Sequence, residues 1–212
     1  MVFIMKKQDA NKQYFHEKVE SKDHLWDRFE TIYFETFEEH ERESVEKLYK
    51  NVLEGVNLIY LVIDQNGNDI GFYILYVSPS VRYSLLWYIG VREASQGAGV
   101  GTRILRGIKD NIAKDDSYDF LILEAEERQS KWYSKNGFEF CDVNYHYPSF
   151  TDDRLIFSHL MRVGYCSDSD HNIRDYLLKV VKDMYVNIYK LDVNSDKYSR
   201  LIKKLPVNYP PL

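Results

Sequence analysis

One stretch of this chain, residues 85–108, constrains the fold more than any other. The apolar run LLWYIGV is typical of a strand buried on both faces. Three glycines at alternate positions follow it (Gly97, Gly99 and Gly101), and apolar residues at helical spacing come next. We therefore expect a strand, a glycine-rich turn and a helix over about 101–113. The missing side chains indicate that something approaches this backbone closely, either another part of the protein or a phosphate.

The flanking sequence predicts further strands and helices in an order that fits an α/β (α+β) chain. Asn66-Gly67 separates two β-rich runs and predicts a hairpin. The other expected strands are 1–5, 120–126, 138–147 and 155–163, and the expected helices are 24–37, 42–53 and 128–136, beside hairpin strands 57–64 and 70–77. This order predicts a mixed sheet of six to seven strands flanked by helices.

The C-terminal part differs from the rest. Apolar residues at helical spacing over 170–191 predict an amphipathic helix, with Asp168 or Ser169 as its N-cap. We divide the chain into a domain over 1–165 and a helical extension over 166–212. The apolar face of the helix either packs on the domain or forms a contact with a partner, which leaves a homodimer possible.

The glycine turn can be compared with known phosphate-binding motifs. A GxxxxGK[ST] loop requires a lysine after the last glycine, and here Thr102 and Arg103 follow Gly101. The dinucleotide motif GxGxxG requires glycine at position 102 and belongs near the start of a βαβ unit, so it fails as well. A turn without these motifs can still bind a diphosphate through bare amides at a helix start.

The segment does match the pattern [Q/R]-x-x-G-x-[G/A], and so resembles the acyl-CoA loop of the GNAT superfamily of N-acyltransferases. Downstream, KWYSKNGFEF (131–140) is similar to the family's FYEKNGF segment. The resemblance covers about 24–163 and implies the GNAT fold. It also implies that acetyl-CoA, as co-substrate, is bound by the loop residues Gln96, Gly97, Ala98, Gly99, Val100, Gly101 and Thr102. A purely structural glycine turn is the alternative.

The resemblance also implies where the thioester is bound. The backbone of Ile89, Gly90 and Val91 would bind the pantetheine arm, and the neighbouring strand FLILEAE would separate from it. Tyr133 occupies the family's tyrosine position and would protonate the leaving thiolate. The alternative is that Tyr133 is only a packing aromatic.

The general base is harder to assign. Glu124 and Glu126 are two residues apart, so on a strand they would share a face and could bind an amine and accept its proton. Glu124 is the first candidate, and two solvated charges are the alternative. The family's Asn-x-x-Ala-x-x-x-Tyr pattern is not kept, since Glu126 and Gln129 stand at its first two places. The contacts assigned to that Asn are therefore in doubt.

Four aromatic residues either line an acceptor pocket or belong to the core: Tyr88, Tyr145, Tyr147 and Phe150. The six histidines are scattered without metal-ligand spacing, so we predict no metal. Cys141 and Cys166 form no motif, and we expect two reduced thiols, with a single disulfide as the alternative.

The net charge of −5 argues against nucleic acid as the partner. No segment approaches the length of a membrane span, so we expect no membrane partner and a cytoplasmic protein. The predicted function is acetyl transfer from acetyl-CoA to a primary amine of a small molecule or peptide, by direct attack in a ternary complex. The alternative is a GNAT-fold module that binds acyl-CoA or a protein partner without turnover.

Overall fold

The computed structural model describes residues 3–4, 14–149, 152–164 and 173–205. The chain forms two compact units, residues 1–79 with 84–115 and residues 80–83 with 116–212. The first unit contains β1 (Phe3–Ile4), β2 (Tyr14–Val19), α1 (His24–Thr36), η1 (Glu39–Glu41), α2 (Val45–Leu53), β3 (Asn57–Asp64), β4 (Asp69–Val77), nearly all of β5 (Tyr83–Val91), η2 (Glu93–Ser95) and α3 (Val100–Ile112). The second contains β6 (Phe120–Ala125), α4 (Glu127–Lys135), β7 (Glu139–Phe140), β8 (His146–Pro148), β9 (Leu155–Phe157), β10 (His159–Gly164), α5 (Ile173–Asp183), η3 (Met184–Ile188) and α6 (Asp196–Lys204).

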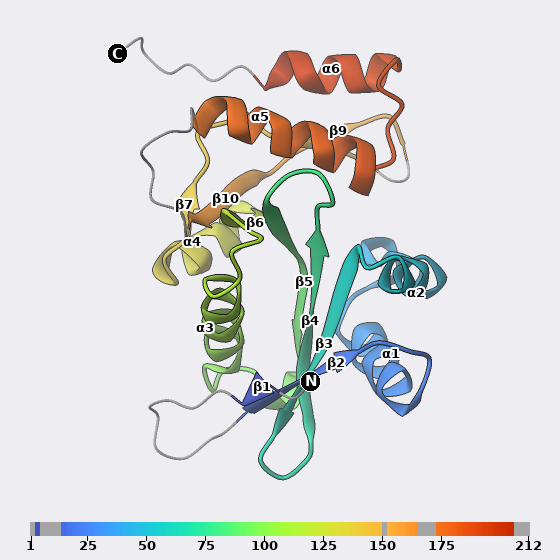
Figure 1. Ribbon diagram of the computed structural model, residues 1–212, viewed down its shortest axis with the longest axis vertical. Helices are drawn as coiled ribbons and strands as arrows, with labels where there is room; N and C mark the ends of the chain where they lie inside the picture. Colours follow the sequence, from blue (N-terminus) through green and yellow to red (C-terminus); the bar gives the residue numbers. More distant parts are fainter. Residues whose placement is uncertain (1–2, 5–13, 150–151, 165–172, 206–212) are drawn as a thin grey trace. The chain divides into compact units, whose positions relative to one another are not determined.

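In the first unit, β1 to β5 pair in chain order and each pair is antiparallel. Gly67 in the predicted hairpin turn has a φ of 85°, which explains the Asn-Gly signal. Strand β2 was not predicted. Helices α1 and α2 lie on one side of these strands and α3 lies on the other (Figure 1).

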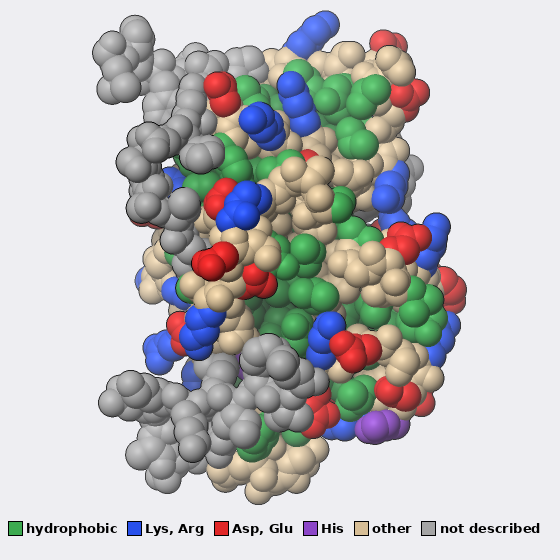
Figure 2. Space-filling view, viewed as in Figure 1, with side chains coloured by type: hydrophobic (Ala, Val, Ile, Leu, Met, Phe, Trp, Pro, Cys, Tyr) green, Lys and Arg blue, Asp and Glu red, His purple; other side chains and the backbone are tan. Residues whose placement is uncertain are grey.

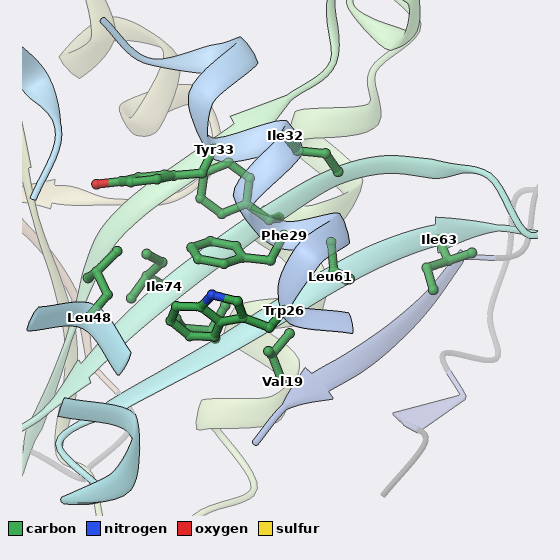
Figure 3. Packing of buried hydrophobic residues seen from close by; sticks show 11 residues of the cluster. Val19, Trp26, Phe29, Ile32, Tyr33, Leu48, Leu61, Ile63 and Ile74 are labelled. Atoms are coloured by element: carbon green, nitrogen blue, oxygen red, sulfur yellow. The ribbon is translucent and has the colours of Figure 1, made fainter. Parts of the chain in front are cut away.

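The core of the first unit lies between α1, α2 and the strands β2 to β4 (Figure 3). Trp26, Phe29 and Tyr33 are at most 2% exposed, and their three- and four-residue spacing places them on one face of α1. The Phe29 ring meets the Phe72 ring edge to face at 5.3 Å. Burying each such ring stabilises the unit by roughly 1.5–3 kcal/mol. Asp23 begins α1 by accepting a 2.8 Å hydrogen bond from the Leu25 amide.

In the second unit, β6, β10 and β7 are neighbours in that order, and β8 pairs separately with β9. Each of the two predicted closing strands is therefore divided. Ser158 lies at one division, where its amide donates to the Tyr145 carbonyl and its hydroxyl donates to the Ala125 carbonyl, both at 3.2 Å. Residues on either side of Ser158 consequently pair with different partners.

The C-terminal extension is helical but is not the single helix that was predicted. Helix α5 ends at Asp183, a π-helical turn follows (η3), and a second helix, α6, was not predicted. The expected N-caps Asp168 and Ser169 lie outside the described residues. No helix in the part of the chain that the structure describes is long and apolar enough to cross a membrane.

The predicted α/β fold class, with flanking helices and a helical extension, is confirmed. The described residues form ten strands, against a prediction of six to seven: β2 was not predicted, and each of the two predicted closing strands is divided in two. Charged side chains of both signs are interspersed on the face seen in Figure 2, as the balanced composition predicts.

Candidate active site

The glycine turn follows η2 and leads directly into α3. Gly97 and Gly99 have φ values of 78° and 72°, a region in which other residues are strained. Residues 96–99 are exposed, and a Cβ added at Gly97 or Gly99 would meet nothing within 4 Å. These two glycines therefore serve the backbone conformation, and no described part of the protein occupies the space beside them.

The amides of this turn are free to bind a ligand. Among the described residues, no group accepts a hydrogen bond from the six amides of residues 97–102. The first helical bond runs from the Arg103 amide to the Gly99 carbonyl at 3.1 Å, and Gly99 is the N-cap without a side-chain capping bond. Free N–H groups and the positive end of the helix dipole thus meet at the start of α3. Such a site favours an anion.

Two side chains hold the turn in place. The Gln96 amide nitrogen donates to the Val91 carbonyl at 3.0 Å, which connects the turn to the end of β5. The Arg103 guanidinium donates to the Ala98 carbonyl at 2.7 Å and to the Tyr14 hydroxyl at 2.8 Å. Arg103 had no predicted role, because its partner on β2 is distant in the chain.

The predicted loop residues in α3 have different surroundings. Val100 is buried and Gly101 and Thr102 are half-buried. The Val100 side chain therefore secures the first turn of the helix, while its amide remains without an acceptor in the described residues.

The end of β5 is shaped by a bulge and a close contact. Leu75 pairs with Leu86 and Ile74 pairs with Tyr88, so Trp87 is an extra residue in β5. Ile89 and Val91 are half-buried and Gly90 is buried. A Cβ at Gly90 would lie 2.4 Å from the Phe72 ring, so packing requires this glycine.

Tyr88 has a structural role in the first unit. Its hydroxyl donates to the Glu41 carbonyl at 3.0 Å and accepts from the Glu43 amide at 3.2 Å. Its ring meets the Tyr33 ring edge to face at 5.5 Å. These contacts support the packing alternative for Tyr88.

Tyr133 lies on α4 in the second unit. Its side chain is 9% exposed, and its ring contacts Trp132 and Phe138 edge to face. Burial raises the pKa of Tyr133 to about 12, so the hydroxyl keeps its proton at neutral pH. No described residue hydrogen-bonds this hydroxyl, which leaves it available to another proton acceptor.

Glu124 is half-buried on β6, and two tyrosine hydroxyls contact its carboxylate. The Tyr189 hydroxyl lies 2.9 Å from Oε1 and 2.8 Å from Oε2, and the Tyr145 hydroxyl also donates to Oε1. Burial raises the pKa of Glu124, and the two hydroxyl donors oppose that shift. A carboxylate with a raised pKa is better suited to accept a proton than a solvated one.

The expected pairing of Glu124 with Glu126 on one strand face is wrong. Strand β6 ends at Ala125, and Glu126 is the exposed N-cap of α4. Glu126 and Gln129 form a capping box, in which the Glu126 amide donates to the Gln129 side chain at 3.0 Å. Both residues that replace the family's Asn and Ala therefore begin a helix.

The other predicted aromatic residues of this unit surround Glu124 or lie outside the described residues. Tyr145 is fully buried and Tyr147 is half-buried, whereas Phe150 is not among the described residues. Tyr185 was predicted only as an apolar position of the C-terminal helix, and Tyr189 had no predicted role, because their hydroxyl groups meet partners only through the tertiary fold.

The structure bears on only part of the cysteine and metal predictions. Cys141 is a buried free thiol whose pKa is raised to about 12 by burial, and Cys166 lies outside the described residues. Within the described ranges, no group of three or more His, Cys, Asp or Glu residues could hold a metal ion.

The sequence was compared with known protein families and with curated proteins. The family described as "Acetyltransferase (GNAT) domain" matches residues 57–140, which include the hairpin, β5, the glycine turn and Tyr133. No curated protein matches the sequence.

Solved structures share the fold at low sequence identity. A putative GNAT-family acetyltransferase from Bacteroides thetaiotaomicron has a TM-score of 0.68 at 18% identity, over 84% of this chain and 99% of its own. Spermidine N-acetyltransferase from Vibrio cholerae, solved with CoA and spermine, gives 0.56 at 16% identity over 71% and 95%. A GNAT-family acetyltransferase from Elizabethkingia anophelis with acetyl-CoA bound gives 0.51 at 18% identity over 74% and 99%.

The family match covers both motifs on which the predicted resemblance depended, the glycine turn and KWYSKNGFEF, and the solved relatives have the same fold. The predicted resemblance is confirmed: residues 57–140 match the GNAT acetyltransferase domain.

Proposed function

We propose that this protein is an N-acetyltransferase that transfers an acetyl group from acetyl-CoA to a primary amine, by direct attack in a ternary complex. The observation that carries the proposal is the exposed glycine turn, with six amides free of described acceptors at the start of α3. Donors in this arrangement fit the diphosphate of coenzyme A. The relatives solved with CoA or acetyl-CoA support the same ligand.

The donor side of the reaction is assigned to the first unit. The amides of residues 97–102 bind the diphosphate, whereas the Gln96 amide already donates to the Glu93 carbonyl at 3.1 Å. The backbone of Ile89, Gly90 and Val91 binds the pantetheine arm. The open space at Gly97 and Gly99 supports close approach of phosphate oxygens, because a Cβ added to either residue would have no described atom within 4 Å.

The chemical roles are assigned to the second unit. The amine nitrogen attacks the thioester carbonyl carbon, a C–N bond forms and the C–S bond breaks. Tyr133 gives its proton to the departing thiolate, and Glu124 accepts a proton from the amine, directly or through water. Solvent then returns the proton from Glu124 to Tyr133, so the cycle closes without another reactant. The raised pKa of Glu124 suits a proton acceptor. The raised pKa of Tyr133 keeps its hydroxyl protonated at neutral pH, so that it has a proton to give.

The acceptor is a primary amine of a small molecule or peptide. The spermine bound to the Vibrio cholerae enzyme supports the inclusion of polyamines in this class. The net charge of −5 favours a cationic acceptor over a polyanion.

Two measurements test the proposal. Acetyl-CoA at a hundred times its Kd should stabilise the folded protein by about 2.7 kcal/mol, seen as a higher melting temperature. The protein should then release free CoA thiol from acetyl-CoA when it is mixed with at least one amine from a panel of polyamines, aminoglycosides, amino acids and peptides. A melting temperature that acetyl-CoA leaves unchanged contradicts CoA binding. Binding with no thiol release from any amine identifies the non-catalytic acyl-CoA module instead.

A further inference from the structure

The C-terminal extension contributes directly to the surroundings of Glu124. Tyr189, which follows η3, places its hydroxyl 2.9 Å from Oε1 and 2.8 Å from Oε2 of Glu124. Tyr145, on the connection before β8, donates to Oε1. The carboxylate therefore has one donor from the extension and one from the preceding part of the second unit.

The backbone before Tyr189 fixes the position of that hydroxyl. The Tyr189 amide donates to the Met184 carbonyl at 3.0 Å, a π-type bond across five residues. Such turns occur often at functional sites. Met184 and Ile188 are buried, and the Tyr185 hydroxyl donates to the His146 carbonyl at 2.7 Å. The turn that precedes Tyr189 is thus held in place by these contacts.

Ring packing holds both donors of the carboxylate. The Tyr189 ring stacks on Tyr147 with 18° between the planes and 6.1 Å between centroids. The Tyr145 ring stacks on Tyr185 at 12° and 5.9 Å. Neither hydroxyl can turn away from Glu124 without disturbing a second ring.

We propose that Tyr189 is a positioning residue for Glu124, so that the C-terminal extension is part of the acetyl-transfer site. The inference rests on the proposed function, in which Glu124 accepts the proton of the amine. A carboxylate offers about four lone-pair sites. Oε2 accepts only from Tyr189 among the described residues, so it retains capacity for a water molecule or the amine. Tyr189 therefore orients the carboxylate without saturating it.

Loss of this donor has a predictable direction. The groups that face Glu124 are the hydroxyls of Tyr145, Tyr147, Tyr185 and Tyr189, and each has a pKa raised first by burial. A hydroxyl donor stabilises the charged carboxylate, so its removal raises the pKa of Glu124 further. The proton-accepting form is then populated only at higher pH.

The test compares Tyr189→Phe with Tyr198→Phe. Tyr198 lies on α6, its ring contacts Tyr185, and no described residue hydrogen-bonds its hydroxyl, so it is a matched control from the same extension. In protein labelled with ¹³C-glutamate, the Glu124 Cδ signal is the one absent from Glu124→Gln. We expect its titration midpoint to move to higher pH in Tyr189→Phe and to stay in place in Tyr198→Phe.

Turnover gives the second readout. At pH values below the wild-type titration midpoint of Glu124, we expect the kcat of Tyr189→Phe to be about tenfold lower than that of the wild type. This factor corresponds to the loss of about one hydrogen bond to a charged group. The kcat should recover as the pH rises. Tyr145→Phe, which removes the other donor, should shift the midpoint in the same direction and provides a second probe. A midpoint unmoved in Tyr189→Phe overturns the inference, whatever the turnover. If the wild-type protein releases no thiol with any amine, the proposed function is overturned. The Cδ titration then still decides whether Tyr189 shifts the titration of Glu124.

Discussion

The His16 ring nitrogen Nδ1 lies 3.0 Å from the Tyr73 hydroxyl inside the first unit. His16 is 1% exposed, and the two rings meet edge to face at 5.4 Å. Burial lowers the pKa of His16 to about 4, so its imidazole is neutral at pH 7. The β2–β4 part of the sheet therefore depends on an uncharged histidine.

We predict that acid weakens the fold through His16. The unfolded chain protonates this histidine below its ordinary pKa of 6.5, and the folded protein resists protonation until about pH 4. The contribution of the neutral His16 to the free energy of unfolding is therefore fully present above pH 6.5 and is lost as the pH falls towards 4. Between pH 7 and pH 5 this loss is about 2 kcal/mol. Urea unfolding at the two pH values measures this loss.

The matched variants are His16→Gln and His24→Gln. Glutamine at position 16 stays neutral, so this variant should lose about 2 kcal/mol less than the wild type between pH 7 and pH 5. His24 is exposed at the start of α1, and its variant should lose as much as the wild type. If the free energy of unfolding falls by the same amount between pH 7 and pH 5 in all three proteins, the prediction is contradicted.

Gly99→Glu should abolish CoA binding without unfolding the protein. The carboxylate would place a negative charge and a side chain where the diphosphate is proposed to bind. The left-handed backbone at Gly99 costs a non-glycine residue roughly 1–2 kcal/mol, and no packing clash adds to it. Calorimetric titration with CoA and thermal unfolding measure the two effects.

Gly67→Glu is the control for this variant. Gly67 is exposed, has a φ of 85° and has no atom within 4 Å of an added Cβ, so the same substitution carries a similar backbone cost in the turn between β3 and β4. CoA affinity should remain at the wild-type value in Gly67→Glu. Equal loss of affinity in both variants would show that the glycine turn is not the binding site.

Tyr133→Phe should lower turnover while CoA affinity and stability are kept. The hydroxyl has no described hydrogen-bond partner, so its removal leaves no buried group unpaired. We expect kcat to fall by about tenfold or less, because general acid catalysis is one of several contributions to the rate. Steady-state kinetics at saturating acetyl-CoA measures the change. An unchanged kcat would remove Tyr133 from the role of acid.

Local signals explain what the sequence could predict. Two β-rich runs around Asn66-Gly67 specify a hairpin, and the alternate glycines specify a turn into a helix, because glycine favours backbone conformations that other residues avoid. Strand β2 has the sequence YFHEKV, whose mixed character becomes a strand only through pairing with β3. The sequence therefore contains too little local information to place it.

The site shows the same division between local and tertiary information. The capping box of Glu126 and Gln129 is a local pattern that the strand interpretation overlooked. The bulge at Trp87 depends on the register between β4 and β5. The contact between Glu124 and Tyr189 joins residues 65 positions apart, and neither residue's neighbours indicate it.

Asp183→Ala should destabilise the second unit. Asp183 is 7% exposed at the end of α5 and accepts hydrogen bonds from Tyr83 at 2.7 Å, Ser80 at 3.0 Å and Asn187 at 2.7 Å. The bonds from Tyr83 and Ser80 join segments about a hundred residues apart, and hydrogen bonds to a charged group contribute about 1.5–3 kcal/mol each. We expect the free energy of unfolding to fall by about 3 kcal/mol, measured by urea unfolding. Asp110→Ala, at an exposed position of α3, should change it by less than about 0.5 kcal/mol. Similar small losses in both variants would mean that Asp183 does not fasten α5 to residues 80–83.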